Sequence, residues 1–394
     1  MSKVLPLAGK ASGKAASSAG EQPLNSVGEI LDELRHGRMV VIMDDEDREN
    51  EGDLIMAAEH VTPEAVAFMI RHTSGIICVP MEEGELARLD LPQMVPVNSE
   101  SQRTAFAVSV DVRAGTTTGV SSLDRAATIR ALASPASTPG DFARPGHIFP
   151  LRSRRGGVLV RAGHTEAAVD LCRLAGLSAV GVLCEVMNDD GTMARRPQLQ
   201  EFARRHGLKI GTIADLIRHR LRTERTVVRI SEQVVQTELG EFRLYAYQDD
   251  ASLEVHVALA HGRLDGPGIP LVRVHVADTL RDLLGVQGVL RAWTLRAAMQ
   301  RIVEAGNGVV VVLRQMESAG ELAEAVRSFA AAPAPPPDTS SAAAEGAVLR
   351  TFGVGAQILK DLGVQRMRVL SARKQMHGIS AFGLEVESYV GEEG

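Results

Sequence analysis

The stretch 44–53 constrains the fold of this chain more than any other, because seven of its ten residues are acidic. It directly follows the apolar run 39–43, a pattern that predicts a short buried strand. The acidic residues therefore form a loop at the end of a rigid element, a common position for functional loops. Carboxylates packed so closely repel one another unless cations compensate them. Hard divalent cations such as Mg2+ take oxygen ligands of this kind, so the stretch predicts a metal site.

Two other interpretations of this stretch have to be weighed. A solvated acidic turn is the plain alternative, because carboxylates are rarely buried without a partner. An EF-hand calcium loop is excluded. Its best register begins at Asp47 and places Gly52 at the required glycine, but Ala58 then stands where a bidentate glutamate is needed. The preceding element is also predicted as a strand, whereas an EF-hand loop follows a helix.

The composition indicates a globular protein with more than one domain. Of the 394 residues, 45% are hydrophobic, enough for sizeable cores in about two or three domains. The net charge of −6 argues against a general nucleic-acid surface. The three cysteines form no C-x-x-C pair, and no apolar run is long enough to span a membrane. Without a signal-peptide pattern, we expect a cytoplasmic protein with no disulfides and no thiolate zinc site.

The pattern of elements predicts two mixed α/β domains after a short tail. Residues 1–25 are rich in Ala, Ser, Gly and Lys, and we expect them to be disordered. The first domain is expected at 26–222, and the charged residues 222–225 mark the boundary. The second is expected at 226–394, with a flexible Pro/Ala-rich loop or linker at 331–346.

Further candidate groups lie in a proline-containing segment and at a helix start. The segment 144–150 is predicted to be a loop and carries His147, although a histidine that caps a turn is the plain alternative. Thr165 is predicted to be the N-cap of a helix, with Arg161 close by. A helix N-terminus beside an arginine is a suitable phosphate site. A buried strand after this helix delivers Glu185.

Together these groups suit a metal-assisted reaction on a small phosphorylated polyol or ketose. A metal held near the acidic loop and His164 would acidify a C–H bond beside a carbonyl group. A carboxylate or an imidazole, such as Glu185 or His147, would move the protons. Arg161 and the helix N-terminus would hold the phosphate.

These motifs resemble 3,4-dihydroxy-2-butanone 4-phosphate synthase, and the resemblance covers residues 25–222. The matching segments occur in the family's order, at 44–53, 144–151, 161–165, 183–185 and 188–194. The resemblance implies conversion of D-ribulose 5-phosphate to 3,4-dihydroxy-2-butanone 4-phosphate and formate, a step of riboflavin synthesis. It also implies an α+β fold with a mixed-sheet α/β sandwich, a homodimer, and two Mg2+ or Mn2+ ions in each active site.

The same resemblance implies roles for individual residues. Glu49 and His164 would bind metal. His147 and Glu185 match positions that the family needs for catalysis. The residues that would contact the substrate are Arg48, Glu49, Asp53, Arg161, Ala162, Gly163, His164, Thr165 and Glu185.

The second half resembles GTP cyclohydrolase II, but the residues that carry that family's chemistry are missing. The framework is kept at 271–275, 314–315, 353–359 and 383–386. The family binds zinc through three cysteines, and an ungapped alignment places Asp278, Val289 and Arg291 at those positions. No cysteine occurs after Cys184. The acid of an Asp-x-Arg pair is replaced by Val348, while its arginine remains.

Three interpretations of this GTP cyclohydrolase II-like half stay open. We expect a catalytically inactive domain with a structural or regulatory role and no zinc, because without zinc no water is activated for hydrolysis. A bifunctional enzyme would need other metal ligands, for which His256, His261 and His275 are the nearby candidates. The half could instead be an interaction module that binds a nucleotide or another riboflavin-pathway enzyme.

Overall fold

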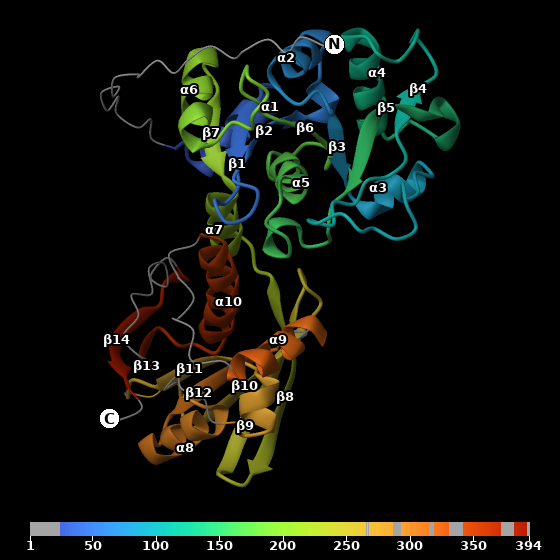
Figure 1. Cartoon of the computed structure of the whole chain (residues 1–394). Coiled ribbons are helices and arrows are strands. Elements are labelled where there is room, and N and C mark those ends of the chain that lie inside the picture. Colours follow the sequence, from blue (N-terminus) through green and yellow to red (C-terminus); the bar gives the residue numbers. More distant parts are fainter. Residues whose placement is uncertain are drawn as a thin grey trace, which may run out of the picture.

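The chain folds into two α/β domains that lie one beyond the other (Figure 1). A computed structural model describes residues 24–264, 266, 268–286, 293–314, 319–330, 342–371 and 382–391. Most of the expected tail and of the Pro/Ala-rich segment, residues 1–23 and 331–341, lie outside the described residues. Asn25, expected in the tail, instead exchanges hydrogen bonds with Ile210. Residues 342–346, expected in a loop, begin helix α10 (Ala342–Asp361).

A seven-stranded mixed sheet forms the centre of the amino-terminal domain, with strand order β4-β5-β3-β6-β2-β1-β7. Strand β2 runs antiparallel to both β1 and β6. The end of β1, the start of β2 and the end of β6 therefore lie side by side along the border that the strand ends form, and this border is the sheet edge that carries the acidic loop. The strands are β1 (Val40–Met43), β2 (Gly52–Ala57), β3 (Cys78–Met81), β4 (Val110–Val112), β5 (Phe142–Arg152), β6 (Gly181–Glu185) and β7 (Lys209–Thr212).

Helices cover both faces of this sheet and bury one continuous core between them. Helices α1, α5 and α7 pack together on one face, while α2 packs with α4 and, through aromatic rings, with α6. This arrangement is the mixed-sheet α/β sandwich that the sequence predicted. The helices are α1 (Val27–Arg35), α2 (Pro63–His72), α3 (Glu83–Arg88), α4 (Ser122–Ala133), α5 (His164–Leu174), α6 (Arg196–His206) and α7 (Ile213–Thr223).

The proline-containing segment 144–150 is part of strand β5, so the prediction of a loop was wrong. The pairing of β5 with β4 is irregular, because Val110 is opposite Ile148 whereas the next residue, Asp111, is opposite Ala143. Pro145 lies inside this irregularity, where no ladder N–H is required of it. The partners that make this segment a strand come from distant parts of the chain, and a local sequence pattern does not contain them.

The carboxy-terminal domain has a second seven-stranded sheet, with order β14-β13-β11-β12-β10-β9-β8. Helix α8 (Leu295–Ala305) packs on one face of it and α10 on the other, and α9 (Ala319–Ala330) is the remaining described α-helix. The strands are β8 (Val227–Thr237), β9 (Gly240–Asp249), β10 (Val255–His261), β11 (Leu271–Val276), β12 (Gly308–Leu313), β13 (Arg366–Leu370) and β14 (Glu385–Val390).

Both faces of strand β12 are buried, and its side chains alternate between two cores. Val309 and Val311 join the cluster that includes Ile358 of α10, whereas Val310 joins the cluster that includes Ile302 of α8. Alternation of this kind is the period-two pattern of a central strand. None of the described helices is long and apolar enough to cross a membrane.

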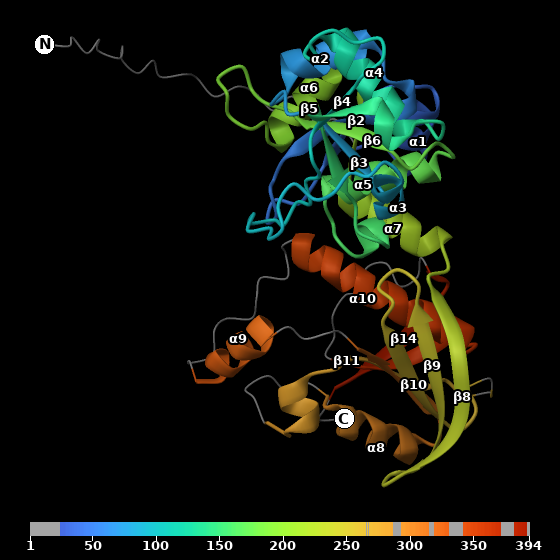
Figure 2. The same cartoon turned by 90° about the vertical axis from the view of Figure 1, so that its right-hand side faces the viewer.

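Helices α7 and α10 form the junction between the domains (Figure 2). The side-chain amide of Gln357 donates to the carbonyl oxygens of Leu221 and Glu224, and its oxygen accepts from the Thr226 amide. A Cβ at Gly353 would lie 2.6 Å from the Leu221 side chain, so a glycine is needed for the close approach of the two helices. The junction is thus a packed contact rather than a free linker.

A buried ion pair connects α7 to α5 inside the amino-terminal domain. Arg220 and Asp170 are 3% and 2% exposed, and Arg220 Nη1 lies 2.7 Å from Asp170 Oδ2. The Asp170 carboxylate also accepts the amide N–H of Val158, and Arg220 donates to the carbonyl oxygen of Gly156. The pair therefore fixes both α7 and the 156–161 segment against the helix that begins at His164.

We expect Arg220→Met to lower the free energy of unfolding by about 3–5 kcal/mol, because it leaves the Asp170 carboxylate buried without its main partner. The double variant Arg220→Met/Asp170→Leu should recover part of this loss, since the buried Asp170 charge is gone and Glu224, the other partner of Arg220, is partly exposed and keeps Arg173 nearby. Urea unfolding of the purified chains measures both effects.

Arg204→Met is the matched control. The pair of Arg204 with Glu201 is exposed, at 66% and 45% of the side chains, so we expect a loss below about 1 kcal/mol. Equal losses for Arg204→Met and Arg220→Met would contradict a special role for the buried pair.

Candidate functional site

Two carboxylates and an imidazole converge at the sheet edge where β1 ends. One ligand atom from each of Asp44, Glu49 and His164 lies within 4.8 Å of the other two. Among the described residues this is the one group of three or more His, Cys, Asp or Glu side chains close enough to hold a metal ion. Two oxygen donors and one imidazole nitrogen suit a hard or borderline divalent cation.

Asp44 organises the acidic loop from within. Its carboxylate accepts hydrogen bonds from the amides of Glu49 and Glu51, at 3.1 and 2.8 Å, and from Arg48 Nη1 at 2.8 Å. Asn50 takes a left-handed backbone conformation, with φ of 55°, which asparagine tolerates better than most residues. The loop is therefore a closed turn around one carboxylate, and it presents Glu49 toward His164.

His164 is the first residue of α5, and Gly163 is its N-cap. The prediction that Thr165 is the N-cap was wrong, because Thr165 lies inside the first turn and is buried. His164 Nε2 lies 3.1 Å from the carbonyl oxygen of Ile42, to which it can only donate. In the neutral imidazole Nδ1 is then the acceptor, and it faces Glu49 Oε2 at 3.7 Å and Asp53 Oδ1 at 3.8 Å. A backbone carbonyl that fixes the tautomer is typical of metal-binding histidines.

Asp53 adds a buried carboxyl group beside these residues. It is 2% exposed, and its Oδ1 atom has no hydrogen-bond partner within the described part of the chain. Burial raises the pKa of Asp53 to about 8, with repulsion from Glu185 and Glu49 adding to the effect. Burial opposes protonation of His164, but attraction to Asp53 and Glu49 dominates and raises the pKa of His164 to about 9. The site thus favours added positive charge, which a divalent cation would supply.

Glu185 lies at the end of β6, directly opposite Asp53 on β2. The Ser74 hydroxyl donates to Glu185 Oε2 at 2.6 Å, and the Ser74 amide donates to the Glu185 carbonyl oxygen at 2.9 Å. The carboxylate is half-buried and held in place, so it is suited to exchange a proton with a bound molecule.

Arg161 lies just before α5 and is oriented by its neighbours. Its Nη1 contacts Glu166 Oε2 at 2.7 Å, and its Nη2 contacts Thr104 Oγ1 at 3.3 Å. A Cβ at Gly163 would lie 2.4 Å from Arg161 Nη1, so glycine is needed for this close passage. Ala162 and Gly163 complete the turn into the helix, whose first N–H groups are directed at any anion placed there.

His147 lies apart from this group. It is on β5, its side chain is 43% exposed, and its Nδ1 lies 2.7 Å from Asp111 Oδ2. A Cβ at Gly119 would lie 2.0 Å from the Asp111 carboxylate, and Gly119 has a φ of 82°, so the pair requires glycine there. No contact among the described residues joins His147 to the carboxylate cluster. Of the residues predicted from the sequence, the structure leaves this one outside the group.

Sequence reasoning did not single out Asp44, Ser74 or Arg195. Arg195 Nη1 donates to the carbonyl oxygens of Glu49, at 2.7 Å, and of Asn50, and so holds the acidic loop from outside. The acidic run contains seven acids, and the sequence analysis did not distinguish Asp44 from the others as the residue that organises the loop. Its position directly after a buried strand could have identified it. Ser74 and Arg195 are distant in sequence from the groups they hold, so only the fold reveals them.

Comparison with known proteins covers both domains. Residues 28–219 match the family model of 3,4-dihydroxy-2-butanone 4-phosphate synthase, and residues 228–391 match that of GTP cyclohydrolase II. A Pseudomonas aeruginosa protein named 3,4-dihydroxy-2-butanone 4-phosphate synthase is 51% identical over 370 residues, which are 94% of this chain and 100% of that protein. A crystal structure of a two-domain synthase from A. baumannii is 41% identical, with a TM-score of 0.79, and covers 93% of this chain and 100% of that one.

The relatives differ in how many activities their names give. A chloroplastic protein of Arabidopsis thaliana named as a bifunctional riboflavin biosynthesis protein is 47% identical over 370 residues, 92% of this chain and 68% of that protein. Identity with it is close to that with the synthase of P. aeruginosa, so similarity of the whole chain does not determine whether the second domain is active.

We expect Asp44→Ala to increase hydrogen–deuterium exchange at the amides of Glu49 and Glu51. Both amides lose their acceptor, and one lost hydrogen bond of this kind corresponds to about tenfold faster exchange. Asp47→Ala removes the same charge from an exposed position of the loop and is the matched control. An equal increase in both variants would show that the loop does not depend on Asp44.

Proposed function

This chain belongs to the 3,4-dihydroxy-2-butanone 4-phosphate synthase family, and we propose that it converts D-ribulose 5-phosphate to 3,4-dihydroxy-2-butanone 4-phosphate and formate in riboflavin biosynthesis. The substrate's carbon atoms divide between a four-carbon ketone phosphate and formate, so the reaction needs no external oxidant or reductant.

The observation that carries this proposal is the cluster of Asp44, Glu49 and His164 next to two further carboxylates, Asp53 and Glu185. We infer that the cluster holds two Mg2+ or Mn2+ ions, with Glu49 and His164 as ligands. When bound, such ions act as Lewis acids toward hydroxyl and carbonyl oxygens of the substrate. The free Nδ1 of His164 and the unpartnered Oδ1 of Asp53 support this assignment.

The protein's own groups would then bind the substrate and move its protons. We assign proton transfer to Glu185, which the Ser74 hydroxyl holds at the sheet edge. Arg48 pairs with Glu49 and Asp53 lies beside His164, and both would contact substrate oxygens. Asp53 is buried, so any hydroxyl group that reaches it is removed from water.

The phosphate end of the substrate would lie at the start of α5. Arg161, Ala162, Gly163 and Thr165 surround the first turn of this helix, whose N–H groups and dipole favour an anion. The bond of Arg161 to Glu166 fixes the plane of the guanidinium group and leaves its charge beside the helix N-terminus. Substrate phosphate and reacting carbons are thus held by residues of one helix start and one sheet edge.

We further propose that the enzyme is a homodimer, and that a second copy covers the surface around His147. Ile76, Val120 and Leu123 are 50%, 47% and 58% exposed. Val120 and Leu123 follow Gly119, which lies against the His147–Asp111 pair, and Ile76 precedes Ile77, whose carbonyl accepts from Phe149 of the strand that carries His147. Exposed apolar side chains gathered in this way are typical of a protein interface. His147, which the family resemblance makes catalytic, would then lie where two copies meet.

We expect the purified chain to release formate from D-ribulose 5-phosphate with Mg2+, to lose this activity in EDTA, and to regain it when Mg2+ is restored. Glu49→Gln removes a ligand and keeps the side-chain shape, so the rate should fall by at least the roughly 10–100-fold seen for groups that merely support a ligand. The measurement is formate released over time.

Glu46→Gln is the control, because Glu46 is exposed in the same loop. Its rate should stay near that of the unaltered chain, and the melting temperature should be unchanged in both variants. Full activity after exhaustive chelation would rule out the metal-assisted reaction, and equal rates for the two variants would remove Glu49 from the site.

For the second domain, we propose that it hydrolyses no GTP and holds no zinc. The histidines that could replace the missing cysteines do not converge. Val257 and His275 both lie opposite Val312, so they point to the same face, and His256 points to the other. His261 shares the face of His275, but it lies opposite Gly308, roughly 13 Å further along the sheet.

The contacts of these histidines support the same conclusion. His275 Nε2 lies 2.7 Å from Asp282, His256 Nδ1 accepts the Arg314 amide, and His261 contacts the Glu241 carbonyl oxygen. Of the aligned zinc positions, Asp278 caps the helical turn after β11, while Val289 and Arg291 lie outside the described residues.

We expect elemental analysis of the purified chain to find far less than one zinc per chain, and GTP to yield no formate. A sample incubated with added zinc tests whether metal was merely lost during purification. We expect that the added zinc neither binds stoichiometrically nor starts GTP turnover. One bound zinc per chain with GTP-dependent formate release would instead make the protein bifunctional.

The cysteines and the charge suit the expected location and partners. Cys78, Cys172 and Cys184 are free and buried, in keeping with a reducing compartment, and we propose the cytoplasm. The net charge of −6 gives no reason to propose a nucleic-acid partner.

A further inference from the structure

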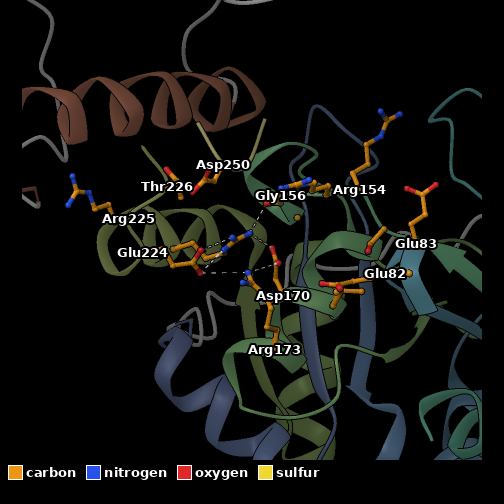
Figure 3. Close-up of a pocket in the computed structure, with 17 residues that line it drawn as sticks. Glu82, Glu83, Arg154, Gly156, Asp170, Arg173, Glu224, Arg225, Thr226 and Asp250 are labelled. Carbon is orange, nitrogen blue, oxygen red and sulfur yellow. Dashed lines mark hydrogen bonds and ion pairs between the residues drawn. The ribbon is translucent and has the colours of Figure 1, made fainter. Parts of the chain in front are cut away.

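A cavity of about 510 Å³ lies at the junction of the two domains (Figure 3). One side is formed by the segment that follows β5 and by the ends of α5 and α7, and the other by Thr226, Asp250 and Ala251. Its volume falls in the range of ligand sites for small molecules, which occur preferentially at domain interfaces. It is separate from the carboxylate cluster, because none of Asp44, Glu49 and His164 lines it.

Part of the charge in this cavity is already neutralised. Asp170, Arg173 and Glu224 lie together on one side of the cavity (Figure 3), and Arg220 pairs with both carboxylates. Arg220 contacts both carboxylates at 2.7 Å, and Arg173 lies 3.3 Å from Asp170 and 3.8 Å from Glu224. These two cations and two anions form a balanced group. This side of the cavity therefore carries charged side chains but no net charge, and the same ion pairs connect α5 to α7.

The remaining charges are open to a ligand. Within the described part of the chain, the guanidinium groups of Arg154 and Arg155 are exposed and have neither an ion pair nor a hydrogen bond. The carboxylates of Glu82 and Asp250 likewise have no partner there. Arg225 forms an ion pair with Asp361 of α10, on the other side of the junction. The cavity thus offers two free cations and two free hydrogen-bond acceptors.

We propose that this cavity binds a phosphate ester of nucleotide size. The planar forks of Arg154 and Arg155 match phosphate oxygens, and arginine is the residue best suited to hold them in pairs. Hydroxyl groups of a sugar and amino groups of a base are donors, and they match the carboxylates of Glu82 and Asp250.

A ligand in this cavity would contact both domains and two elements that lead to the proposed substrate site. The segment 154–157 leads directly to Arg161, and Asp170 is on the same helix as His164. A Cβ at Gly156 would lie 2.5 Å from the carbonyl oxygen of Ala251, so glycine there lets the second domain pack on this segment. The cavity is therefore placed where a bound molecule would connect the state of the junction to the start of α5.

The test is isothermal titration calorimetry of the full chain with AMP, in EDTA so that no metal takes part. We expect one AMP per chain, and at least about tenfold weaker binding in Arg154→Ala/Arg155→Ala, since charge-assisted hydrogen bonds are lost. The same loss of affinity is expected for adenosine, which has no phosphate. Arg154→Lys/Arg155→Lys keeps the charge without the fork and should be intermediate.

Two control variants show whether a change in AMP affinity comes from this cavity. Arg204→Ala/Arg205→Ala removes the same charge from an exposed face of α6 and should leave AMP binding unchanged. Arg161→Ala, at the proposed substrate site, should also leave it unchanged. The proposal fails if AMP does not bind at up to about 1 mM, a weak limit for a small ligand. It also fails if the Arg154/Arg155 and Arg204/Arg205 alanine variants bind alike, or if Arg161→Ala alone abolishes binding.

Discussion

The concentration of buried negative charge at one sheet edge is the constraint on which this structure depends. Strand β2 runs antiparallel between β1 and β6, so Asp53 and Glu185 are brought opposite each other beside the acidic loop. Two cationic groups compensate this negative charge only in part: Arg48, and His164 with its pKa raised to about 9. The acidic loop itself is kept closed by amide hydrogen bonds to Asp44. Among the described residues, the buried Oδ1 atom of Asp53 still has no hydrogen-bond partner, and divalent cations suit such a place.

Local patterns in the sequence predicted the elements well, and contacts between distant segments account for what they missed. Ser26 and Glu29 form a capping box at the start of α1, and Thr62 caps α2 before Pro63, so each of these helix starts is encoded by residues close together in the sequence. By contrast, β5 exists because of partners on β3 and β4, so its prolines suggested a loop. The acidic run pointed to a site, but it could not show which acid closes the loop. Supporting groups such as Ser74 and Arg195 act across the fold and leave no motif.

The second domain is packed around two apolar cores, and its described residues include no group of three or more His, Cys, Asp or Glu side chains close enough to hold a metal ion. Strand β12 contributes to two cores, and a substitution on either face would disturb one of them. Metal ligands need a stricter arrangement, because three side chains must point to one place. The histidines of β10 and β11 are divided between opposite faces and opposite ends of the sheet. A sheet of this kind does not need a bound metal ion to stay folded, since its strands are stabilised by apolar burial.

The junction provides a physical connection through which the second domain can act on the first. Gln357 and Asp361 of α10 bind the segment from Leu221 to Thr226, which continues directly from α7. Helix α7 carries Arg220, whose buried pair with Asp170 reaches the helix that begins at His164. Packed elements joined by a buried charge pair move together or not at all, because separating the pair leaves a charge without a partner. Displacement of α10 would therefore act on the start of α5, where the proposed metal ligand and phosphate site lie, without any residue of the second domain touching them.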